Sequence, residues 1–310
     1  MSSNYTITFA CYNQLDYTKQ FIASLDREEV DFSRIVAVDN GSTDGTREWL
    51  GQQGFGAVVL NDRNLGCGAA WNQGALAIQS KWTVVMNNDV ICAKGWLRNL
   101  LAAAEANQLH VASPAMVEGE LNYDFDAWAT VAQTKMTGYV RQGDPHAVCM
   151  AIRDDVWSEI GYFMPVPKLL GYEDAIFFQR ALEAGLKTGT CADSWLHHYG
   201  MTTQKALKLE MKLDQNDSLG NRNLMRLYMA QTWLARKLAR YQRRRLLKAA
   251  RANELAMCGK TLHAIHRKEL LEQNAEKIRA FLPPTIPVGL YSAGLKRSQT
   301  DQPVICAGIQ

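Results

Sequence analysis

The 310-residue chain lacks the sequence features of several protein classes. Its seven cysteines form an odd set without a C-x-x-C pair, which is neither a disulfide framework nor a zinc-binding pattern. We therefore expect reduced thiols and a cytoplasmic location. The N-terminus has no basic flank and apolar core of a signal peptide, and no window reaches roughly eighteen uninterrupted apolar residues. We expect neither a secretion signal nor a membrane-spanning segment.

The whole chain also lacks an excess of charge of one sign. It has 34 Lys plus Arg against 31 Asp plus Glu, and this net charge of +3 is too small to indicate nucleic acid as a partner. Hydrophobic residues make up 47% and charged residues 21%, which excludes a wholly disordered or collagen-like chain. At this length we expect one large domain with an appendage, or two domains.

Short β-rich runs alternate with helical patterns in the N-terminal part. The predicted strands cover residues 6–12, 34–39, 57–60 and 82–86, and the predicted helices cover residues 17–25, 46–52, 69–79 and 95–107. Such alternation is typical of a doubly wound α/β sheet, in which polar residues at the carboxyl ends of the strands collect in one crevice.

The pattern weakens between Glu118 and His146, where Gly, Asp, aromatic and Thr residues follow no clear period. We predict a variable loop region there. Regularity returns in a strand and two helices, which we predict at residues 147–152, 154–160 and 174–184.

Polar motifs follow the predicted strands and open one of the predicted helices. In chain order they are Ala10-Cys11-Tyr12-Asn13, Val38-Asp39-Asn40-Gly41-Ser42-Thr43-Asp44, Asn64-Leu65-Gly66 with Asn72-Gln73-Gly74, Asn87-Asn88-Asp89, and Gly171-Tyr172-Glu173-Asp174. A carboxylate at a strand end, such as Asp39, can accept hydrogen bonds from a base imide or a ribose hydroxyl. Ser42 and Asp44 are better explained as residues that cap the next helix.

These five motifs, in this order, resemble the successive motifs of family 2 glycosyltransferases with the GT-A fold, over roughly residues 5–203. The resemblance implies an α/β fold with a doubly wound, mostly parallel sheet flanked by helices. It implies an inverting enzyme that transfers a sugar from a UDP- or dTDP-linked donor to a hydroxyl acceptor. That acceptor would be a glycan, a lipid-linked saccharide or a protein, with a role in polysaccharide biosynthesis.

The resemblance also assigns residues to the donor and to a metal. The residues assigned to the donor are Ala10, Tyr12, Asn13, Asp39, Arg63, Asn64, Gly66, Asn72, Asn87 and Asn88. In the family a D-x-D motif holds a divalent metal on the donor diphosphate, and only the last carboxylate, Asp89, remains here. We expect Mn²⁺ or Mg²⁺ on Asp89, completed by the donor phosphates. A polar turn would explain one of Asn87 and Asn88 equally well.

Two further segments resemble late motifs of the family. His197 and His198 precede Gly200 as in an H-x-x-G segment, and a neutral imidazole is a reasonable further metal or diphosphate ligand, with the spacing favouring His197. Glu173 and Asp174 open a predicted helix, where acidic residues also serve as caps. By resemblance Asp174 deprotonates the acceptor hydroxyl, which is typically worth ~10²–10⁴ in rate, and Glu173 places it. Tyr172 is the candidate for stacking on an acceptor sugar.

Two alternatives to an active glycosyltransferase follow from the same motifs. A sugar-nucleotidyltransferase needs a Gly-rich phosphate loop with Arg and Lys after the first strand, whereas this chain has Ala10-Cys11-Tyr12-Asn13-Gln14 there. A GT-A scaffold that binds a nucleotide-sugar without catalysis is suggested by the amide at Asn87 in place of a carboxylate.

The small net charge divides into two opposed halves. Residues 1–205 hold 15 Lys plus Arg and 23 Asp plus Glu, a net of −8, whereas residues 206–310 hold 19 and 8, a net of +11. Residues 236–251 contain eight basic residues and no acid, interleaved with leucines. A solvated helix face would explain this run. Its density favours an anionic partner, which would be the inner face of a membrane or the acidic half of a neighbouring subunit.

We therefore predict three parts of the chain. Residues 1–204 form the catalytic domain, residues 205–282 a basic helical extension, and residues 283–310 an irregular tail. The extension is predicted because it has almost no turn signals and repeats apolar residues at helical spacing. Pro283-Pro284 ends it.

Overall fold

The computed structural model describes residues 4–27, 30–164, 171–200, 212, 233–259 and 261–262. The strands are β1 (Tyr5–Cys11), β2 (Ile35–Asp39), β3 (Ala57–Leu60), β4 (Trp82–Asn87), β5 (Val90–Cys92), β6 (Val111–Glu118), β7 (Val140–Gln142), β8 (Cys149–Arg153) and β9 (Thr188–His198). The helices are α1 (Leu15–Asp26), the 3-10 turn η1 (Phe32–Arg34), α2 (Thr46–Leu50), α3 (Cys67–Ala77), α4 (Trp96–Ala106), α5 (Phe125–Lys135), α6 (Asp154–Ile160), α7 (Glu173–Glu183) and α10 (Trp233–Cys258).

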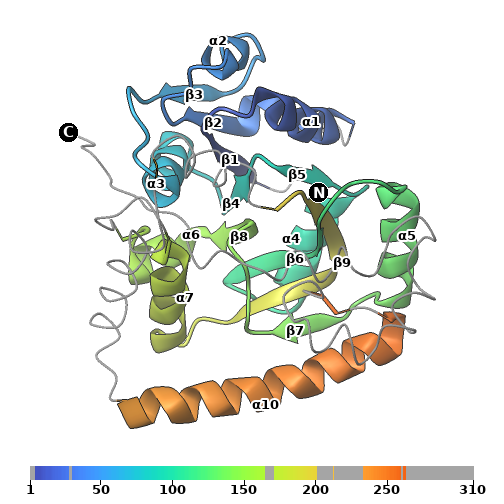
Figure 1. Cartoon of the computed structure of the whole chain (residues 1–310). Helices are drawn as coiled ribbons and strands as arrows, with labels where there is room; N and C mark the ends of the chain where they lie inside the picture. The colour runs from blue at the N-terminus through green and yellow to red at the C-terminus, as the bar shows by residue number, and fades with distance from the viewer. Residues whose placement is uncertain are drawn as a thin grey trace.

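The strands form one mixed sheet in the order β3-β2-β1-β4-β8-β6-β9-β5, with β7 paired to β9 (Figure 1). The four strands β3, β2, β1 and β4 run parallel, and β8 joins them to the other half by antiparallel pairing. β1 and β2 are buried on both faces because helices cover the two sides, which is why their sequences read as apolar runs. The predicted α/β fold is confirmed.

The predicted elements agree with the structure except in one region. The strands and helices predicted up to residue 107 and from residue 147 to 184 are present, with ends shifted by no more than two residues. The loop predicted between Glu118 and His146 is wrong, because this segment contains the end of β6, the helix α5 and the strand β7. The strand β7 is too short to show a sequence period. In α5, threonines interrupt the helical pattern of apolar residues.

Those threonines are compatible with the helix because their hydroxyls bond within it. Thr130 and Thr134 donate to the carbonyls four residues earlier, and Thr137 does so just beyond the end of α5. Phe125, Trp128, Ala129 and Ala132 form its buried face.

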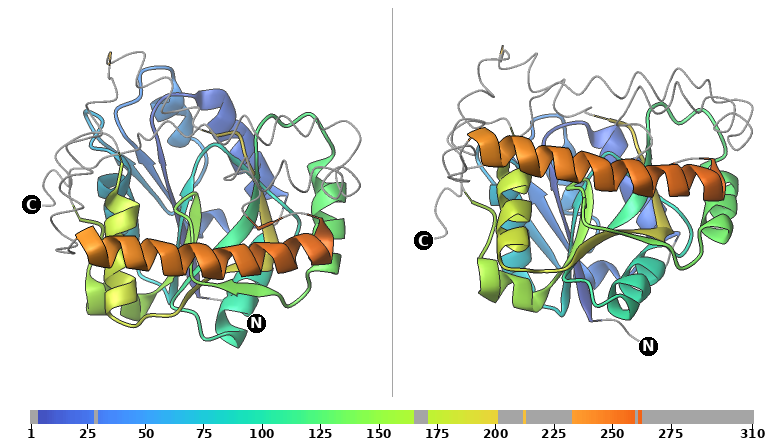
Figure 2. Two further views of the ribbon diagram at one scale, coloured as in Figure 1. Left: turned by 60° about the horizontal axis from the view of Figure 1, so that its bottom comes forward. Right: turned by 90° about the horizontal axis from the view of Figure 1, so that it is seen from below.

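The helix α10 lies along one side of the sheet, below β7 and β9 in the view of Figure 1 and across the molecule in both views of Figure 2. It confirms a helix within the predicted extension for residues 233–258. The remaining parts of that prediction, residues 205–232 and 259–282, fall almost entirely outside the described residues, as does the predicted tail, residues 283–310.

The six cysteines in the described part of the chain are free thiols, five of them buried. Burial raises the pKa of the Cys11 and Cys149 thiols well above the ordinary value. These cysteines are therefore unreactive residues of the core. None of the helices among the described residues combines the length and the apolar character needed to cross a bilayer.

Candidate active site

The loops after β1 and β2 are tied together by hydrogen bonds. The backbone N–H of Asn13 donates to Ser42 Oγ at 2.8 Å, and Thr43 N–H donates to Asn13 Oδ1 at 2.8 Å. Asp44 accepts the N–H of Leu15, the first residue of α1, and caps α2 through Thr46. Asp44 thus bonds the start of α2 as the sequence suggested, whereas Ser42 joins the two loops and does not cap that helix.

Asp39 closes its own turn at the end of β2. Its carboxylate accepts the backbone N–H groups of Gly41 and Ser42 at 3.2–3.3 Å and lies 3.9 Å from Arg47 Nε. The residue is fully buried in this arrangement. The structure explains Asp39 as a turn residue, and contact with a donor base or ribose stays a prediction.

Asn40, which the sequence analysis left without a role, organises the loop after β3. Its amide donates to Asn64 Oδ1 and to the Gly66 carbonyl, and its oxygen accepts from Asn61 Nδ2 and Leu65 N–H. Asn64 and Gly66 are thereby fixed beside the end of β2. A sequence signal existed, since an amide directly after Asp39 is a typical organiser of turns.

Arg63 is exposed at the same loop, and its backbone passes over Gly41. A Cβ at Gly41 would lie 2.8 Å from Arg63 Cα, and Gly41 has φ +87°, so only glycine fits there. Arg63 itself is exposed to solvent, and its contact with the donor stays a prediction.

Asn72 bridges α3 to the segment before α7. Its Nδ2 donates to the Phe163 carbonyl and its Oδ1 accepts the Phe163 N–H, each at 2.9 Å, and the side chain is buried. This pair of bonds gives Asn72 a positioning role, and direct donor binding stays a prediction.

The Asn87-Asn88-Asp89 motif follows β4, next to the end of β1. Asn87 pairs with Ala10 in the sheet register and is partly exposed. Asn88 is buried and donates to Thr18 Oγ1 of α1 at 2.8 Å. Asn88 therefore has a structural role, which is to bond α1. Asn87, Ala10 and the half-buried Tyr12 lie at the ends of β4 and β1.

Asp89 lies in a buried cluster with His198 and Glu118. His198 Nε2 is 3.2 Å from Asp89 Oδ1, and His198 Nδ1 is 3.9 Å from Glu118 Oε2. The sheet register brings them together, because His198 pairs with Glu118 of β6 on one side and with Val90, next to Asp89, on the other. Glu118 was not recognised in the sequence, since its segment was taken for a loop.

The two carboxylates control the charge of His198. Burial disfavours the imidazolium, but Asp89 and then Glu118 outweigh burial and raise the pKa of His198 to about 10. The cluster therefore holds a proton on His198 at neutral pH. A metal ion bound by this imidazole would have to displace that proton.

His197 faces the opposite side of β9, as consecutive strand residues do. Its Nδ1 is 3.1 Å from the Tyr123 hydroxyl and its Nε2 is 3.0 Å from the Gly119 carbonyl, with Phe125 packed against the ring. Both ring nitrogens thus have protein partners. His198, rather than the His197 favoured by motif spacing, is the imidazole beside Asp89.

The cluster suits a divalent metal in its chemistry. Carboxylate and imidazole groups are ligand types that Mn²⁺ or Mg²⁺ accepts, but here the ring nitrogens of His198 face the carboxylates of Asp89 and Glu118. Within the described residues no group of three or more His, Cys, Asp or Glu is arranged to hold a metal ion. Asp89 and His198 as metal ligands stay a prediction.

Glu173 and Asp174 occupy the first turn of α7, as predicted. Asp174 is half-buried and its Oδ1 accepts the N–H of Ala175 at 2.7 Å, while Glu173 is buried. The helix N-terminus favours the ionised carboxylate of Asp174. Tyr172 precedes them with φ +81°, an uncommon backbone conformation for a residue with a bulky side chain.

The mixed sheet flanked by helices, with polar residues at the ends of its strands, is an α/β fold of the GT-A type. Residues 6–191 match the family model described as glycosyl transferase family 2, and the chain belongs to this family. No curated protein matches the chain.

Solved structures share the fold at low sequence identity. The crystal structure of GalNAc-T7 with UDP, GalNAc and Mn²⁺ matches with 14% identity and a TM-score of 0.51, over 64% of this chain and 44% of that one. S. aureus TarS 1–349 matches with 15% identity and a TM-score of 0.49, over 64% and 60%. The chain spans less than two thirds of the length of either structure.

Proposed function

We propose that the protein is an inverting, metal-dependent glycosyltransferase that moves a sugar from a nucleotide diphosphate sugar to a hydroxyl acceptor. The observation that carries the proposal is the family 2 match together with Asp89 and His198 side by side at the carboxyl end of β4. A bound divalent metal would neutralise the negative charge that develops on the leaving diphosphate. Asp89 and His198 would hold it, with donor phosphates as further ligands.

The chain's own residues supply the other parts of the reaction. The strand-end loops that carry Asn13, Asp39, Arg63 and Asn64 form the donor side, and hydrogen bonds of Asn13 to Ser42 and of Asn64 to Asn40 hold these loops before the donor binds. Such preorganisation lowers the cost of binding.

Asp174 is the proposed base. It takes the proton of the acceptor hydroxyl as that oxygen attacks the anomeric carbon, and the bond from this carbon to the diphosphate oxygen breaks in the same displacement, which inverts the anomeric configuration. Glu173, buried beside it, fixes the start of α7 and so places Asp174. Tyr172 precedes both and is the proposed platform for the acceptor sugar.

The proposed donors are UDP- or dTDP-linked hexoses, hexosamines or deoxyhexoses. GalNAc-T7 was solved with UDP, GalNAc and Mn²⁺, so UDP-hexosamines with Mn²⁺ are the first set to test. The free thiols support a reducing compartment, and we place the reaction in the cytoplasm, where the acceptor is a glycan, a lipid-linked saccharide or a protein.

The test is Asp174→Asn beside a matched variant, Glu183→Gln, which removes a carboxylate from the exposed end of the same helix. Donors are first found by thermal shift with and without Mn²⁺, because a ligand that binds only the folded state raises the unfolding temperature. Asp174→Asn should lose at least ~10²-fold in transfer and keep the donor shift, whereas Glu183→Gln should match the wild type.

Wild-type turnover of Asp174→Asn would reject Asp174 as the base. Full transfer in the presence of EDTA would reject the metal. Donor binding without transfer or hydrolysis across a panel of acceptors would favour the alternative of a catalytically inactive, nucleotide-sugar-binding scaffold, which the amide at Asn87 suggests.

A further inference from the structure

The helix α10 has two parts with different surroundings. Its C-terminal part packs on the body of the protein, with Leu247, Arg251, Glu254, Leu255 and Cys258 buried. Apart from the neighbours Glu254 and Leu255, these residues recur at intervals of three or four, and together they form one face of the helix. Every side chain described between Trp233 and Leu246 is exposed. The helix is thus held at one end and presents its other end to the surroundings.

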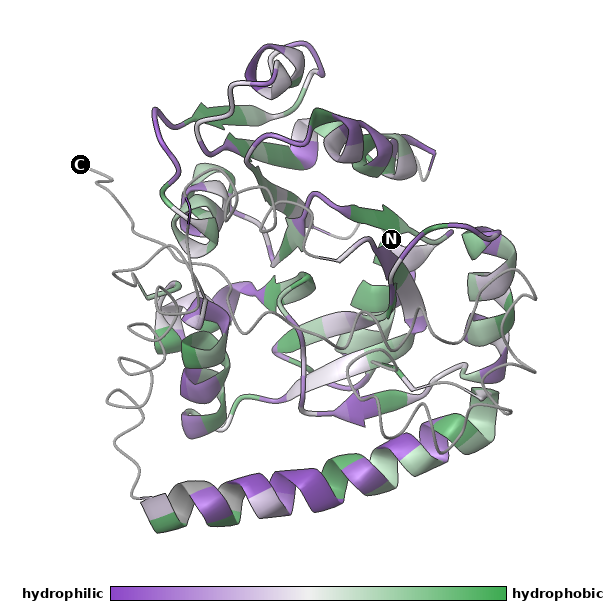
Figure 3. Cartoon of the chain, viewed as in Figure 1, coloured by the Kyte–Doolittle hydropathy of each residue, from purple (hydrophilic) through white to green (hydrophobic). Residues whose placement is uncertain are grey.

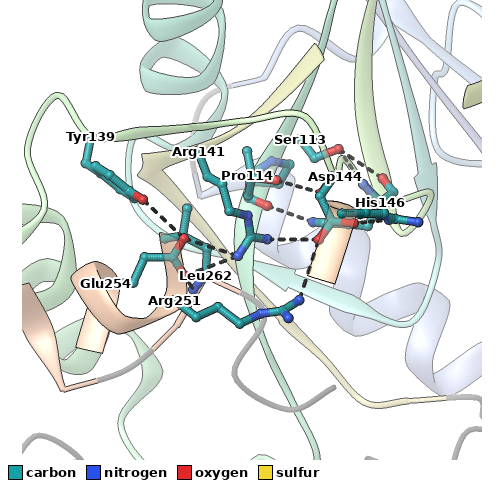
Figure 4. A network of polar contacts seen from close by, with 11 residues as sticks. Ser113, Pro114, Tyr139, Arg141, Asp144, His146, Arg251, Glu254 and Leu262 are labelled. Carbon is teal, nitrogen blue, oxygen red and sulfur yellow. Dashed lines mark hydrogen bonds and ion pairs between the residues drawn. The ribbon is translucent and has the colours of Figure 1, made fainter. Parts of the chain in front are cut away.

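Buried ion pairs fix the docked end (Figure 4). Glu254 accepts hydrogen bonds from Arg141 at 3.1 and 3.2 Å and from Leu262 N–H at 2.9 Å, and Tyr139 OH lies 3.3 Å away. Arg251 lies 3.6 Å from Asp144. Because breaking such a pair leaves a buried charge uncompensated, the orientation of α10 on the body is well determined.

The exposed part of α10 is basic. Its exposed basic residues are Lys237, Arg240, Arg243, Arg244, Arg245 and Lys248. The one acidic residue of the helix is Glu254, which is buried and paired with Arg141. Figure 3 shows hydrophilic residues prevailing along the middle part of the helix. No acid of its own helix neutralises these residues, and of the six only Arg243 is ion-paired with a described acid of the body, Asp144.

Large apolar side chains lie among these charges. Leu234 is 69%, Leu238 57% and Tyr241 60% exposed, and their spacing of four and three residues puts them along one face. At 3.6 residues per turn this face is directed away from the docked residues. Trp233 at the helix start is 63% exposed, with Lys237 over its ring at 4.4 Å.

We propose that this face of α10, residues 233–248, docks the protein on an anionic bilayer surface. Leucine and aromatic side chains enter the interface between headgroups and acyl chains, while lysine and arginine contact the anionic headgroups. A second copy of this helix would be a poor occupant, because two faces without acids repel each other. A bilayer satisfies the apolar and the basic residues at once.

Membrane docking would also orient the catalytic site. The ion pairs of Glu254 with Arg141 and of Arg251 with Asp144 hold α10 against the body of the protein. A bilayer that binds α10 would therefore set the orientation of the catalytic domain relative to the membrane. A lipid-linked acceptor would then reach the crevice from one side. This consequence rests on the proposed function, whereas the docking itself does not.

The experiment is co-sedimentation of the full chain with phosphatidylcholine vesicles, with or without one third phosphatidylglycerol, and with no donor present. Binding should require phosphatidylglycerol. Arg244→Ala/Arg245→Ala should weaken it at least ~10-fold, since each basic residue near anionic lipid contributes about fivefold. The matched control Lys94→Ala/Arg98→Ala removes two exposed basic residues from the catalytic body and should bind as the wild type does.

A second variant, Leu238→Ser/Tyr241→Ser, tests the apolar residues and should also weaken binding, with circular dichroism confirming that α10 is retained. Equal binding with and without phosphatidylglycerol, or an equal loss in Arg244→Ala/Arg245→Ala and in Lys94→Ala/Arg98→Ala, would overturn the proposal. So would a wild-type dimer that the second variant converts to a monomer in sedimentation velocity without any change in vesicle binding. The face would then be an interface between copies of this chain.

Discussion

Two buried charged clusters in this protein differ in their balance of charge. At the ends of β5, β6 and β9, the carboxylates of Asp89 and Glu118 flank a single imidazole, His198. Under α10, the carboxylates of Glu254 and Asp144 meet Arg141 and Arg251, with Arg243 added at the surface. The first cluster has an excess of acid, and the second has none.

The difference distinguishes a binding site from a structural joint. A buried cluster that already pairs each acid with a guanidinium gains nothing from a further ion and serves to fix two elements. A cluster with an unmatched carboxylate attracts a cation, whether a proton on His198 or a metal. Buried charge alone would not separate the two, since both clusters are shielded from solvent.

The largest effect that would sharpen this comparison is expected for Asp89→Asn. If Asp89 holds the metal, transfer should fall by about 10²–10³ in kcat, and the thermal shift produced by Mn²⁺ should disappear. The free energy of unfolding should also fall, because Asp89 is the principal partner of the buried His198, so transfer is measured at a temperature at which the variant is folded.

The matched control is Glu159→Gln, which removes an exposed carboxylate from α6 and should leave both measurements unchanged. An Asp89→Asn protein that retains full transfer, or one that unfolds while its residual activity stays normal, would make this cluster structural as well. Both clusters would then serve only to hold elements of the fold together.

Glu254→Gln should show the opposite pattern. Removing its charge leaves Arg141 buried without its principal partner, at a cost of about 3 kcal/mol. Hydrogen exchange of α10 amides should accelerate about a hundredfold through local detachment of the helix, while donor affinity stays as in the wild type. Lys248→Gln, an exposed change on the same helix, is the control. Unchanged exchange in Glu254→Gln would show that apolar packing alone docks α10.

The smallest effect concerns pH. Burial opposes ionisation of Asp144, but Arg243, Arg141 and Arg251 together hold the pKa of Asp144 below its ordinary value of 3.8. A lowered folded-state pKa means that Asp144 stabilises the fold above pH 3.8 and that this contribution is lost as the pH falls through the lower value.

Asp144→Asn should therefore lower the free energy of unfolding by about 1–2 kcal/mol at pH 7, and the difference from the wild type should shrink below pH 3.8. Urea unfolding at several pH values measures it. Glu254 in the same network shifts the opposite way, since burial raises its pKa more than its neighbours lower it. A difference that grows on acidification would contradict the role given to Asp144.

Much of the fold and part of the site could be predicted from the sequence. The alternation of apolar runs and helical patterns identified β1 to β4 and their helices, because a buried parallel strand has a nearly continuous apolar sequence. The basic character of α10 and the acidic start of α7 were also evident. The motif order indicated the family, which the match over residues 6–191 shows.

The amino-acid sequence by itself therefore determined the order of the elements from β1 to β4, the strand-end polar residues and the charge of the two halves. Only the tertiary structure decided which of these residues meet. His198 faces Asp89 and His197 does not, because neighbouring strand residues point to opposite faces and the register of β9 against β5 and β6 selects the face. Glu254 finds Arg141, 113 residues away in sequence, for a similar reason: such contacts depend on how elements pack, which local sequence patterns do not encode.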